Sequence, residues 1–154
     1  RESSPFLKDS IFDVSVYTSR PEKWSNVIEL EWHDPSGKIL GNYSGSIKKA
    51  SNNPNELFPD ADYVVFCMPV HKYRIALHEI APYLNKNKKV FVGTVYGQGG
   101  WNWMVDEIRK EYNLNNIVTF AFGLIPWICR LIEYGKKGEI FIFKILKYKS
   151  EGGV

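Results

Sequence analysis

The sequence has few cysteines and lacks long apolar runs, and both features narrow the kind of protein it can be. Its two cysteines, Cys67 and Cys129, are far apart in a chain of 154 residues, and each lies among apolar residues. Such a pair is typical of two reduced, buried thiols rather than a disulfide, and it favours a reducing, cytoplasmic compartment. The longest apolar stretch, 63–70, is far shorter than the roughly 20 residues that span a bilayer, and no signal peptide is visible. We therefore expect a soluble protein without a membrane partner.

A strong excess of one charge is also lacking. Twenty basic residues oppose 17 acidic ones, for a net charge of +3. The basic residues are scattered among acidic ones, and the longest basic tracts are pairs, so nucleic acid is not an expected partner. The two cysteines and three histidines have no close spacing, so no metal site is predicted.

Aromatic residues are plentiful. They make up 15% of the chain, with nine Phe, nine Tyr and five Trp, beside 44% hydrophobic and 24% charged residues. This balance is that of a folded globular protein, and it provides enough large apolar surface to close a core at this length. The length predicts one domain over 1–154.

Strand and helix patterns alternate along most of the chain. Alternating residues predict a strand at 13–18, and a turn at 19–22 leads into a short helix with Lys23 and Trp24. Two further alternating runs, 28–33 and 38–43, flank an Asp-Pro-Ser-Gly turn and predict a β-hairpin.

Strand-and-helix units follow the hairpin. Apolar runs predict strands at 62–68, 89–93, 117–122 and 139–146. Helical spacing predicts helices at 72–84 and 101–112, and one or two helical turns at 125–132. Together these elements predict an α/β fold: a Rossmann-like, mostly parallel sheet with helices on both faces and the hairpin as an insertion.

In such sheets ligands bind beyond the carboxyl ends of the strands, so the loops that follow strands are the first candidates. Ser19 and Arg20 follow the first strand and offer a hydroxyl group and a fixed cation. In dinucleotide domains a carboxylate at this place selects NAD, whereas arginine accommodates the 2′-phosphate of NADP. The absence of a carboxylate favours NADPH. A turn arginine exposed to solvent remains the alternative.

The next strand ends at Pro69 and Val70. A proline that ends a buried strand makes a tight exit whose backbone groups can line a cofactor, although a purely structural turn stays open as an alternative. The neighbouring His71 can change protonation near neutral pH, but no partner is assigned to it, so we expect no catalytic role. His33 and His78 are expected at the surface.

The third loop, 93–100, is rich in glycine and precedes a predicted helix. Its backbone N–H groups can approach an anion at the positive end of that helix. The glycine spacing matches neither a Walker loop nor the dinucleotide fingerprint. Gln98 is more informative, because an amide flanked by Gly97 and Gly99 can reach a carbonyl or carboxylate group without obstruction.

A fourth stretch, 123–130, is too apolar for a solvent loop. Core packing of Trp127 and Ile128 is expected. Arg130 then needs a partner or a path to water, since an unpaired buried charge costs several kcal/mol.

This fourth stretch also carries a resemblance. The run Leu-Ile-Pro-Trp-Ile-Cys-Arg at 124–130, followed by Glu-Tyr-Gly-Lys-Lys at 133–137, resembles the Leu-Pro-Trp-x-Cys-Arg…Glu-Phe-Gly-Arg-Lys stretch of octopine and related opine dehydrogenases. Matching segments precede it in the same order: Ala-Asp-Tyr-Val-Val at 61–65, Pro69, Ala-Pro-Tyr-Leu at 81–84 and Gln-Gly-Gly-Trp at 98–101. The resemblance runs over residues 14–144.

The resemblance implies reductive condensation of an amino acid with a 2-oxo acid such as pyruvate, with NAD(P)H as the hydride donor to the imine. It places Pro69 and Val70 beside the cofactor, Gln98 near the 2-oxo acid and the nicotinamide, and Cys129 on the amino-acid side of the pocket. The position of Ser19 and Arg20 at the adenosine ribose comes from strand order and not from a shared motif.

The chain also departs from the family pattern. The family opens with a strand and a glycine-rich loop that grips the pyrophosphate, and no such segment precedes Asp13. The family's catalytic His and Asp and its 2-oxo-acid-binding Arg lie in a second, helical domain, so we expect no catalytic residues within 1–154. Loss of the loop removes several charged hydrogen bonds at about 1.5–3 kcal/mol each. We therefore expect these residues alone to bind cofactor weakly and to catalyse nothing.

Two other readings stay open. The chain is also compatible with the cofactor domain of another two-domain reductase, of the ketopantoate reductase or glycerol-3-phosphate dehydrogenase type. A non-catalytic nucleotide-binding or protein-interaction domain is the third reading. The sequence does not specify which amino acid reacts or the oligomeric state, although apolar surface where a second domain would dock favours self-association.

Overall fold

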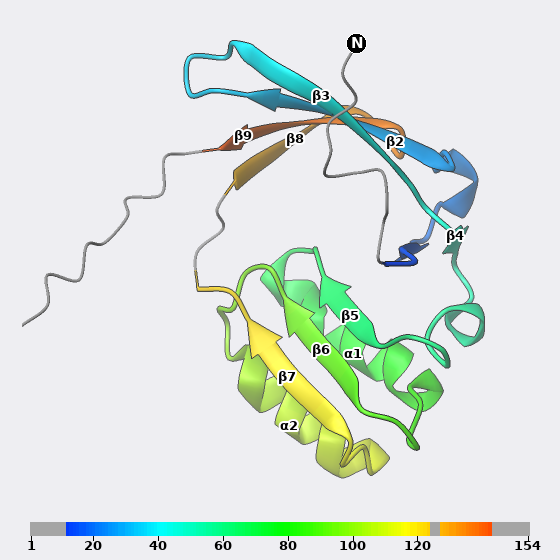
Figure 1. Ribbon diagram of the computed structural model, residues 1–154. Helices are drawn as coiled ribbons and strands as arrows, with labels where there is room; N and C mark the ends of the chain where they lie inside the picture. Colours follow the sequence, from blue (N-terminus) through cyan, green and yellow to red (C-terminus); the bar gives the residue numbers. More distant parts are fainter. Residues whose placement is uncertain (1–11, 124–126, 143–154) are drawn as a thin grey trace, which may run out of the picture.

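The computed structural model describes residues 12–123 and 127–142, which form an α/β fold with three β-sheets (Figure 1). The strands are β1 Ser15–Tyr17, β2 Val27–His33, β3 Ile39–Ser46, β4 Lys49–Ser51, β5 Tyr63–Phe66, β6 Val90–Thr94, β7 Ile117–Ala121, β8 Trp127–Glu133 and β9 Lys137–Ile142. The α-helices are α1 Tyr73–Ile80 and α2 Trp101–Tyr112, and the 3-10 helices are η1 Pro21–Lys23, η2 Pro54–Glu56, η3 Val70–Lys72 and η4 Ala81–Tyr83. No helix in the described ranges is long and apolar enough to cross a membrane.

The strands β5, β6 and β7 form a parallel sheet that carries the main core. The register pairs Val64 with Val92 and Phe66 with Thr94, and all four residues are buried against α1 and α2. These helices bury residues at helical spacing, because each has one apolar stripe. The parallel strand-and-helix units predicted from the sequence are confirmed here.

A cluster of aromatic side chains joins both helices to this sheet. The ring of Trp101 lies 5.0 Å from Phe66 and 5.1 Å from Tyr73, measured between centroids. The indole N–H of Trp101 donates a hydrogen bond of 3.0 Å to Oγ1 of Thr119, and the hydroxyl groups of Tyr73 and Thr94 lie 2.6 Å apart. The side-chain polar atoms of Trp101, Tyr73 and Thr94 therefore have partners, and the start of α2 is fixed against the sheet.

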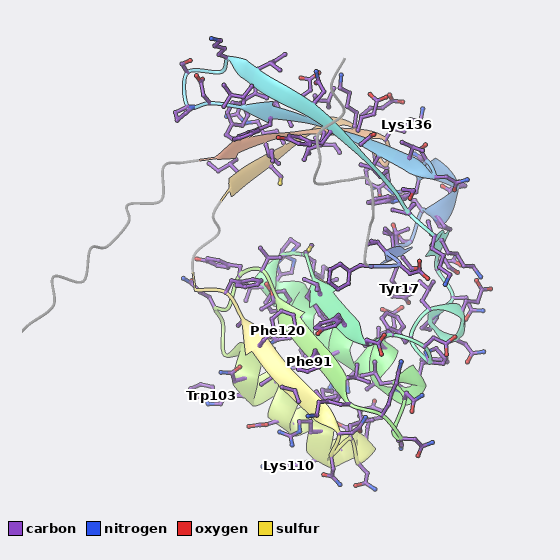
Figure 2. All side chains as sticks on the ribbon, viewed as in Figure 1. Tyr17, Phe91, Trp103, Lys110, Phe120 and Lys136 are labelled. Atoms are coloured by element: carbon purple, nitrogen blue, oxygen red, sulfur yellow. The ribbon has the colours of Figure 1, made fainter. Side chains whose placement is uncertain are left out.

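Both helices lie on one face of the β5–β6–β7 sheet, so the prediction of helices on both faces is wrong for the described residues (Figure 1). Burial alternates along β5, and Tyr63 and Val65 are exposed. Their face also carries Phe91, whose ring stacks on Tyr63 at 4.9 Å, and Phe120, which crosses over Gly93 (Figure 2). The apolar run at 62–68 was interpreted as a strand covered on both faces, but it has only one covered face.

The second sheet has the order β3-β2-β9-β8 and contains the predicted hairpin. Strands β2 and β3 pair antiparallel, from Val27 opposite Ser46 to His33 opposite Ile39. The Asp34 carboxylate holds the turn by accepting hydrogen bonds from the backbone N–H groups of Ser36 at 2.8 Å and Lys38 at 3.0 Å. The hairpin is confirmed.

The helical turns predicted at 125–132 are wrong, because 127–133 is strand β8. Residues 125 and 126 lie outside the described part. Strand β8 pairs antiparallel with β9, and Gly135, with φ of +71°, makes the turn between them. A Cβ atom at Gly135 would lie 2.3 Å from the carbonyl oxygen of Lys23, so glycine is required there. The final predicted strand is confirmed as β9, apart from 143–146, which lie outside the described residues.

The third sheet consists of β1 and β4, paired in parallel from Ser15 opposite Lys49 to Tyr17 opposite Ser51. Tyr17 packs on Phe58, with ring centroids 5.3 Å apart, and its hydroxyl donates to Glu79 on α1 at 2.5 Å. Figure 1 shows this small sheet beyond the β5 edge of the three-stranded sheet. The single sheet predicted from the sequence is therefore divided among the described strands.

Candidate functional site

The loops after β5 and β6 meet at the carboxyl ends of these strands. Val70 follows Pro69 in the first loop, and Gly99 lies in the second. A Cβ atom at Gly99 would be 2.2 Å from Cγ1 of Val70, and the φ of Gly99 is +68°. The two loops thus touch at a place where only glycine fits. The structure brings together Pro69, Val70 and the loop of Gln98, as expected of a shared ligand site.

The loop with Gln98 is tied down on both sides. The Tyr73 hydroxyl donates to the carbonyl of Tyr96 at 3.1 Å, and the N–H of Gly97 donates to the carbonyl of Phe122 at 2.9 Å. The N–H of Gln98 donates to Tyr96 at 2.9 Å, and the residue itself is exposed. A fixed backbone with an exposed amide side chain suits recognition of a small polar ligand.

The same loop leads directly into α2. Gly99 and Gly100 both have positive φ, and Gly100 is the residue that caps the helix start. The first N–H groups of a helix have no partner within it, and they favour anions. An open hollow lies beside this helix start, lined by Val70, His71, Arg74, Gly99, Gly100 and Trp103. Arg74 also lines this hollow, and its guanidinium pairs with the carboxylate of Glu107 on α2.

Ser19 and Arg20 lie after β1, as predicted, and both are exposed. The Arg20 guanidinium stacks over the ring of Tyr134, with its carbon 4.4 Å from the ring centroid. The Tyr134 hydroxyl lies 3.3 Å from Oγ1 of Thr18. Hydrogen bonding to Thr18, and to a smaller extent the charge of Arg20, lowers the pKa of Tyr134. Arg20 is therefore held by an aromatic partner from the β8–β9 turn, which the sequence reasoning missed.

The interpretation of both cysteines as buried thiols is wrong, because Cys67 and Cys129 are exposed. The protein around the Cys67 sulfur nevertheless displaces enough water to raise its pKa, and the charge of Cys129 raises it further. Cys67 lies just before the Pro69 turn, and Cys129 lies on β8.

The two histidines expected at the surface are more buried than predicted. His33 is buried, with 7% exposed, so its expected surface position is wrong. His78 is partly buried, and its Nδ1 lies 3.3 Å from the Tyr112 hydroxyl.

Arg130 is exposed and stacks over Phe141 at 5.1 Å, which provides both a partner and a path to water. Core packing is wrong for Ile128, which is 47% exposed, and the Trp127 side chain lies outside the described part.

Comparison with known proteins identifies the relatives of this chain, although no family model matches it. The opine dehydrogenase of Haliotis discus hannai is 27% identical over 139 residues, which cover 86% of this chain and 34% of that protein. The tauropine dehydrogenase of Arabella iricolor is 24% identical over 147 residues, covering 89% of this chain and 35% of that protein. The chain is a distant relative of the opine dehydrogenases. It spans about a third of the length of the relatives it matches.

Solved structures extend the likeness from sequence to fold. Octopine dehydrogenase in complex with NADH and L-arginine matches with a TM-score of 0.69 at 18% identity, covering 82% of this chain and 32% of that one. Octopine dehydrogenase with NADH and pyruvate gives the same TM-score, covering 83% of this chain and 33% of that one. The resemblance to opine dehydrogenases is therefore confirmed, and the α/β fold is shared.

Proposed function

We propose that the chain is the NAD(P)-binding domain of an opine-type dehydrogenase. In this reaction an amino acid condenses with a 2-oxo acid such as pyruvate, and NAD(P)H reduces the resulting imine. The observation that carries the proposal is the strand order of the two parallel sheets. We assign the catalytic residues to a second domain outside these residues. We expect the complete protein to be located in the cytoplasm.

The order of the described strands fits a Rossmann-like sheet in which one further strand lies outside the described residues. Across the sheet of a six-stranded dinucleotide fold, the strands, numbered by their place in the sequence, lie in the order 3-2-1-4-5-6. Strands β4 and β1 match positions three and two, and β5, β6 and β7 match positions four, five and six. One parallel strand between β1 and β5 completes the order. Phe12, just before β1, contacts Tyr63 on β5, with ring centroids 6.4 Å apart, which supports adjacent edges at this place.

The further strand is the one that precedes the pyrophosphate-binding loop of such folds. We assign that strand and its loop to a segment outside the described residues. The remaining cofactor contacts then come from the loops described above. Ser19 and Arg20 face the adenosine ribose, and Pro69 and Val70 lie along the cofactor.

The substrate side of the site is assigned to Gln98 and Cys129. Gln98 holds the 2-oxo acid near the nicotinamide, and Cys129 lines the amino-acid side. The matched octopine dehydrogenase structures were solved with NADH and with pyruvate, L-arginine or agmatine, which supports small-molecule substrates of these two classes. Arg20, stacked on Tyr134, favours NADPH here.

Titration of the chain with NADPH and NADH, followed by backbone amide NMR, tests the cofactor site. We expect weak binding, with shifts at Arg20, Val70 and 97–100. Shifts confined to other surfaces, or no shifts at millimolar cofactor, would reject the proposed site. Micromolar affinity would contradict the expected weak binding.

A test of the reaction class requires the protein encoded by the complete gene. We expect that product to oxidise NAD(P)H when an amino acid and pyruvate are both present. Oxidation with a lone ketone at the same rate would favour the ketopantoate reductase or glycerol-3-phosphate dehydrogenase type. A product without any such oxidation, but with cofactor binding, would favour a non-catalytic nucleotide-binding domain.

A further inference from the structure

One face of the four-stranded sheet gathers a histidine and two glutamates. Strands β2 and β9 pair in parallel, with Glu31 opposite Glu139 and His33 opposite Phe141. Side chains alternate between faces along a strand, so Glu31, His33 and Glu139 share one face. Their ligand atoms all lie within 4.8 Å of one another. The cluster is separate from the candidate cofactor site, and its interpretation is independent of the proposed function.

The distances within the cluster match those around a small metal ion. Nε2 of His33 lies 3.2 Å from Oε2 of Glu31 and 3.6 Å from Oε2 of Glu139. Zinc bonds of about 2.0–2.1 Å in tetrahedral geometry separate neighbouring ligand atoms by about 3.3 Å. The two distances from His33 are close to this value, and the two carboxylate ligand atoms lie within 4.8 Å of each other, so the three atoms surround a point that a metal ion could occupy.

The hydrogen bonding of His33 leaves the atom that faces this point without a donor partner. Nδ1 of His33 lies 3.1 Å from the carbonyl oxygen of Gly37, which accepts and cannot donate. The neutral ring therefore carries its proton on Nδ1, and Nε2 presents a lone pair to two carboxylates. Three acceptors then face one another, and the His33 side chain is only 9% exposed. A cation among them relieves this arrangement, either a metal ion or a proton on Nε2.

Neighbouring charges balance part of the cluster. Lys137 Nζ binds the other oxygen of Glu31, Oε1, at 2.6 Å, so Oε2 stays directed at His33. Arg130 pairs with Glu139 in the strand register, but its guanidinium stacks on Phe141. Phe141 also stacks on the imidazole of His33 at 5.0 Å, which fixes the orientation of the ring. Two carboxylates directly opposite each other are otherwise destabilising in a sheet.

We propose that His33, Glu31 and Glu139 bind a divalent transition metal, with Zn²⁺ as the best fit. Imidazole with carboxylates is a zinc ligand set, and a backbone carbonyl on the second ring nitrogen is the usual way to fix such a histidine. Water completes the coordination. The hard ion Mg²⁺ prefers an all-oxygen environment and binds more weakly here. The metal joins β2 to β9, the first and the last strand in chain order of the four-stranded sheet.

Calorimetry and NMR of the histidine rings test the site on the intact chain. We expect one Zn²⁺ per chain, a shift of the His33 ring nitrogens, and a Tm that rises with Zn²⁺ concentration but not with Mg²⁺. Glu139→Gln removes one ligand with little change in shape, so we expect a loss of at least ~10-fold in Zn²⁺ affinity. Glu29→Gln is the matched control, because Glu29 lies on the same strand near Lys137 and outside the cluster. Its Zn²⁺ affinity should stay unchanged.

The exposed thiols Cys67 and Cys129 are the competing zinc ligands, and Co²⁺ distinguishes them by its thiolate charge-transfer absorption. A thiolate band together with unchanged affinity in Glu139→Gln would overturn the proposal. An absence of metal binding, with a protonated Nε2 on His33 at neutral pH, would overturn it as well, since a proton would then be the cation of the cluster.

Discussion

The guanidinium group of Arg20 stacks over the phenol ring of Tyr134, 4.4 Å from its centroid, and joins the loop after β1 to the turn between β8 and β9. A cation above an aromatic face is stabilised by about 0.5–1 kcal/mol at an exposed site. The stack limits the orientations that Arg20 can take at the carboxyl end of β1. The aromatic partner thus prepares Arg20 for an anion without neutralising its charge.

Arg20→Glu should reverse the cofactor preference. A carboxylate at this place repels a 2′-phosphate and accepts a hydrogen bond from a ribose hydroxyl. We expect the ratio of NADPH to NADH affinity to fall at least ~10-fold, which corresponds to about 1.4 kcal/mol. Competition titrations measure the ratio, and Tyr134→Phe is the control because it keeps the ring. An unchanged ratio in Arg20→Glu would refute the assignment of Arg20 to the 2′-phosphate.

Gly99→Ala should destabilise the contact between the two loops. The new Cβ would collide with Cγ1 of Val70, and the positive φ of Gly99 is unfavourable for alanine. We expect a loss of about 1–3 kcal/mol in the free energy of unfolding, measured with urea. Gly45→Ala in β3 is the control, since nothing lies within 4 Å of its Cβ position. Val70→Ala should restore part of the loss, and a failure to do so would show that steric contact is not the cause.

Thr94→Val should weaken the anchor of the glycine-rich loop. The Thr94 hydroxyl donates to the carbonyl of Phe66 at 3.1 Å and accepts from the N–H of Tyr96 at 3.2 Å. Valine has a similar shape but removes both hydrogen bonds. The Tyr96 N–H loses this partner, and the Phe66 carbonyl keeps only a long bond of 3.4 Å from the N–H of Val95, so we expect a cost of about 1–3 kcal/mol. Urea unfolding measures the loss, and hydrogen exchange should be faster at the Tyr96 amide. A variant as stable as the parent would mean that water replaces the hydroxyl.

Tyr17 should ionise at unusually high pH. Burial, and then the hydrogen bond and charge of Glu79, raise the pKa of Tyr17 to about 12 from its ordinary value of 10.0. A folded-state pKa above the unfolded value means that this stabilisation is fully present below pH 10 and is lost as the pH rises towards about 12. Tyrosinate absorbance measures the titration. Glu79→Gln should lower the pKa of Tyr17 only in part, because the burial contribution remains.

Short sequence patterns were sufficient to predict helix α2 and the β2–β3 hairpin. Helix α2 begins and ends at the predicted residues, because glycines precede it and its apolar residues share one stripe. The hairpin β2–β3 follows from its turn residues. Strand β8 was misassigned because a short apolar run does not distinguish helix from strand, and its partner β9 decides the outcome.

Site features that depend on distant residues were harder to predict. Cys67 and Cys129 have apolar neighbours in the sequence, but exposure depends on which face of the chain other elements cover. The loops of Val70 and Gln98 were predicted correctly as neighbours, since both follow parallel strands of one sheet. The Arg20–Tyr134 stack joins residues far apart in the chain, and no local pattern reports such a contact.

The parallel pairing of β2 with β9 has a consequence for the order of folding. It joins Glu29 to Lys137, which are 137 − 29 = 108 positions apart, whereas β5, β6 and β7 with their two helices use residues 63–121. Contacts between distant positions form slowly, because a long segment must first close on itself. During synthesis on the ribosome, the three-stranded unit should therefore acquire structure first. Strand β2 can pair with β3 early, but it must wait until residues 137–142 have emerged before it can pair with β9.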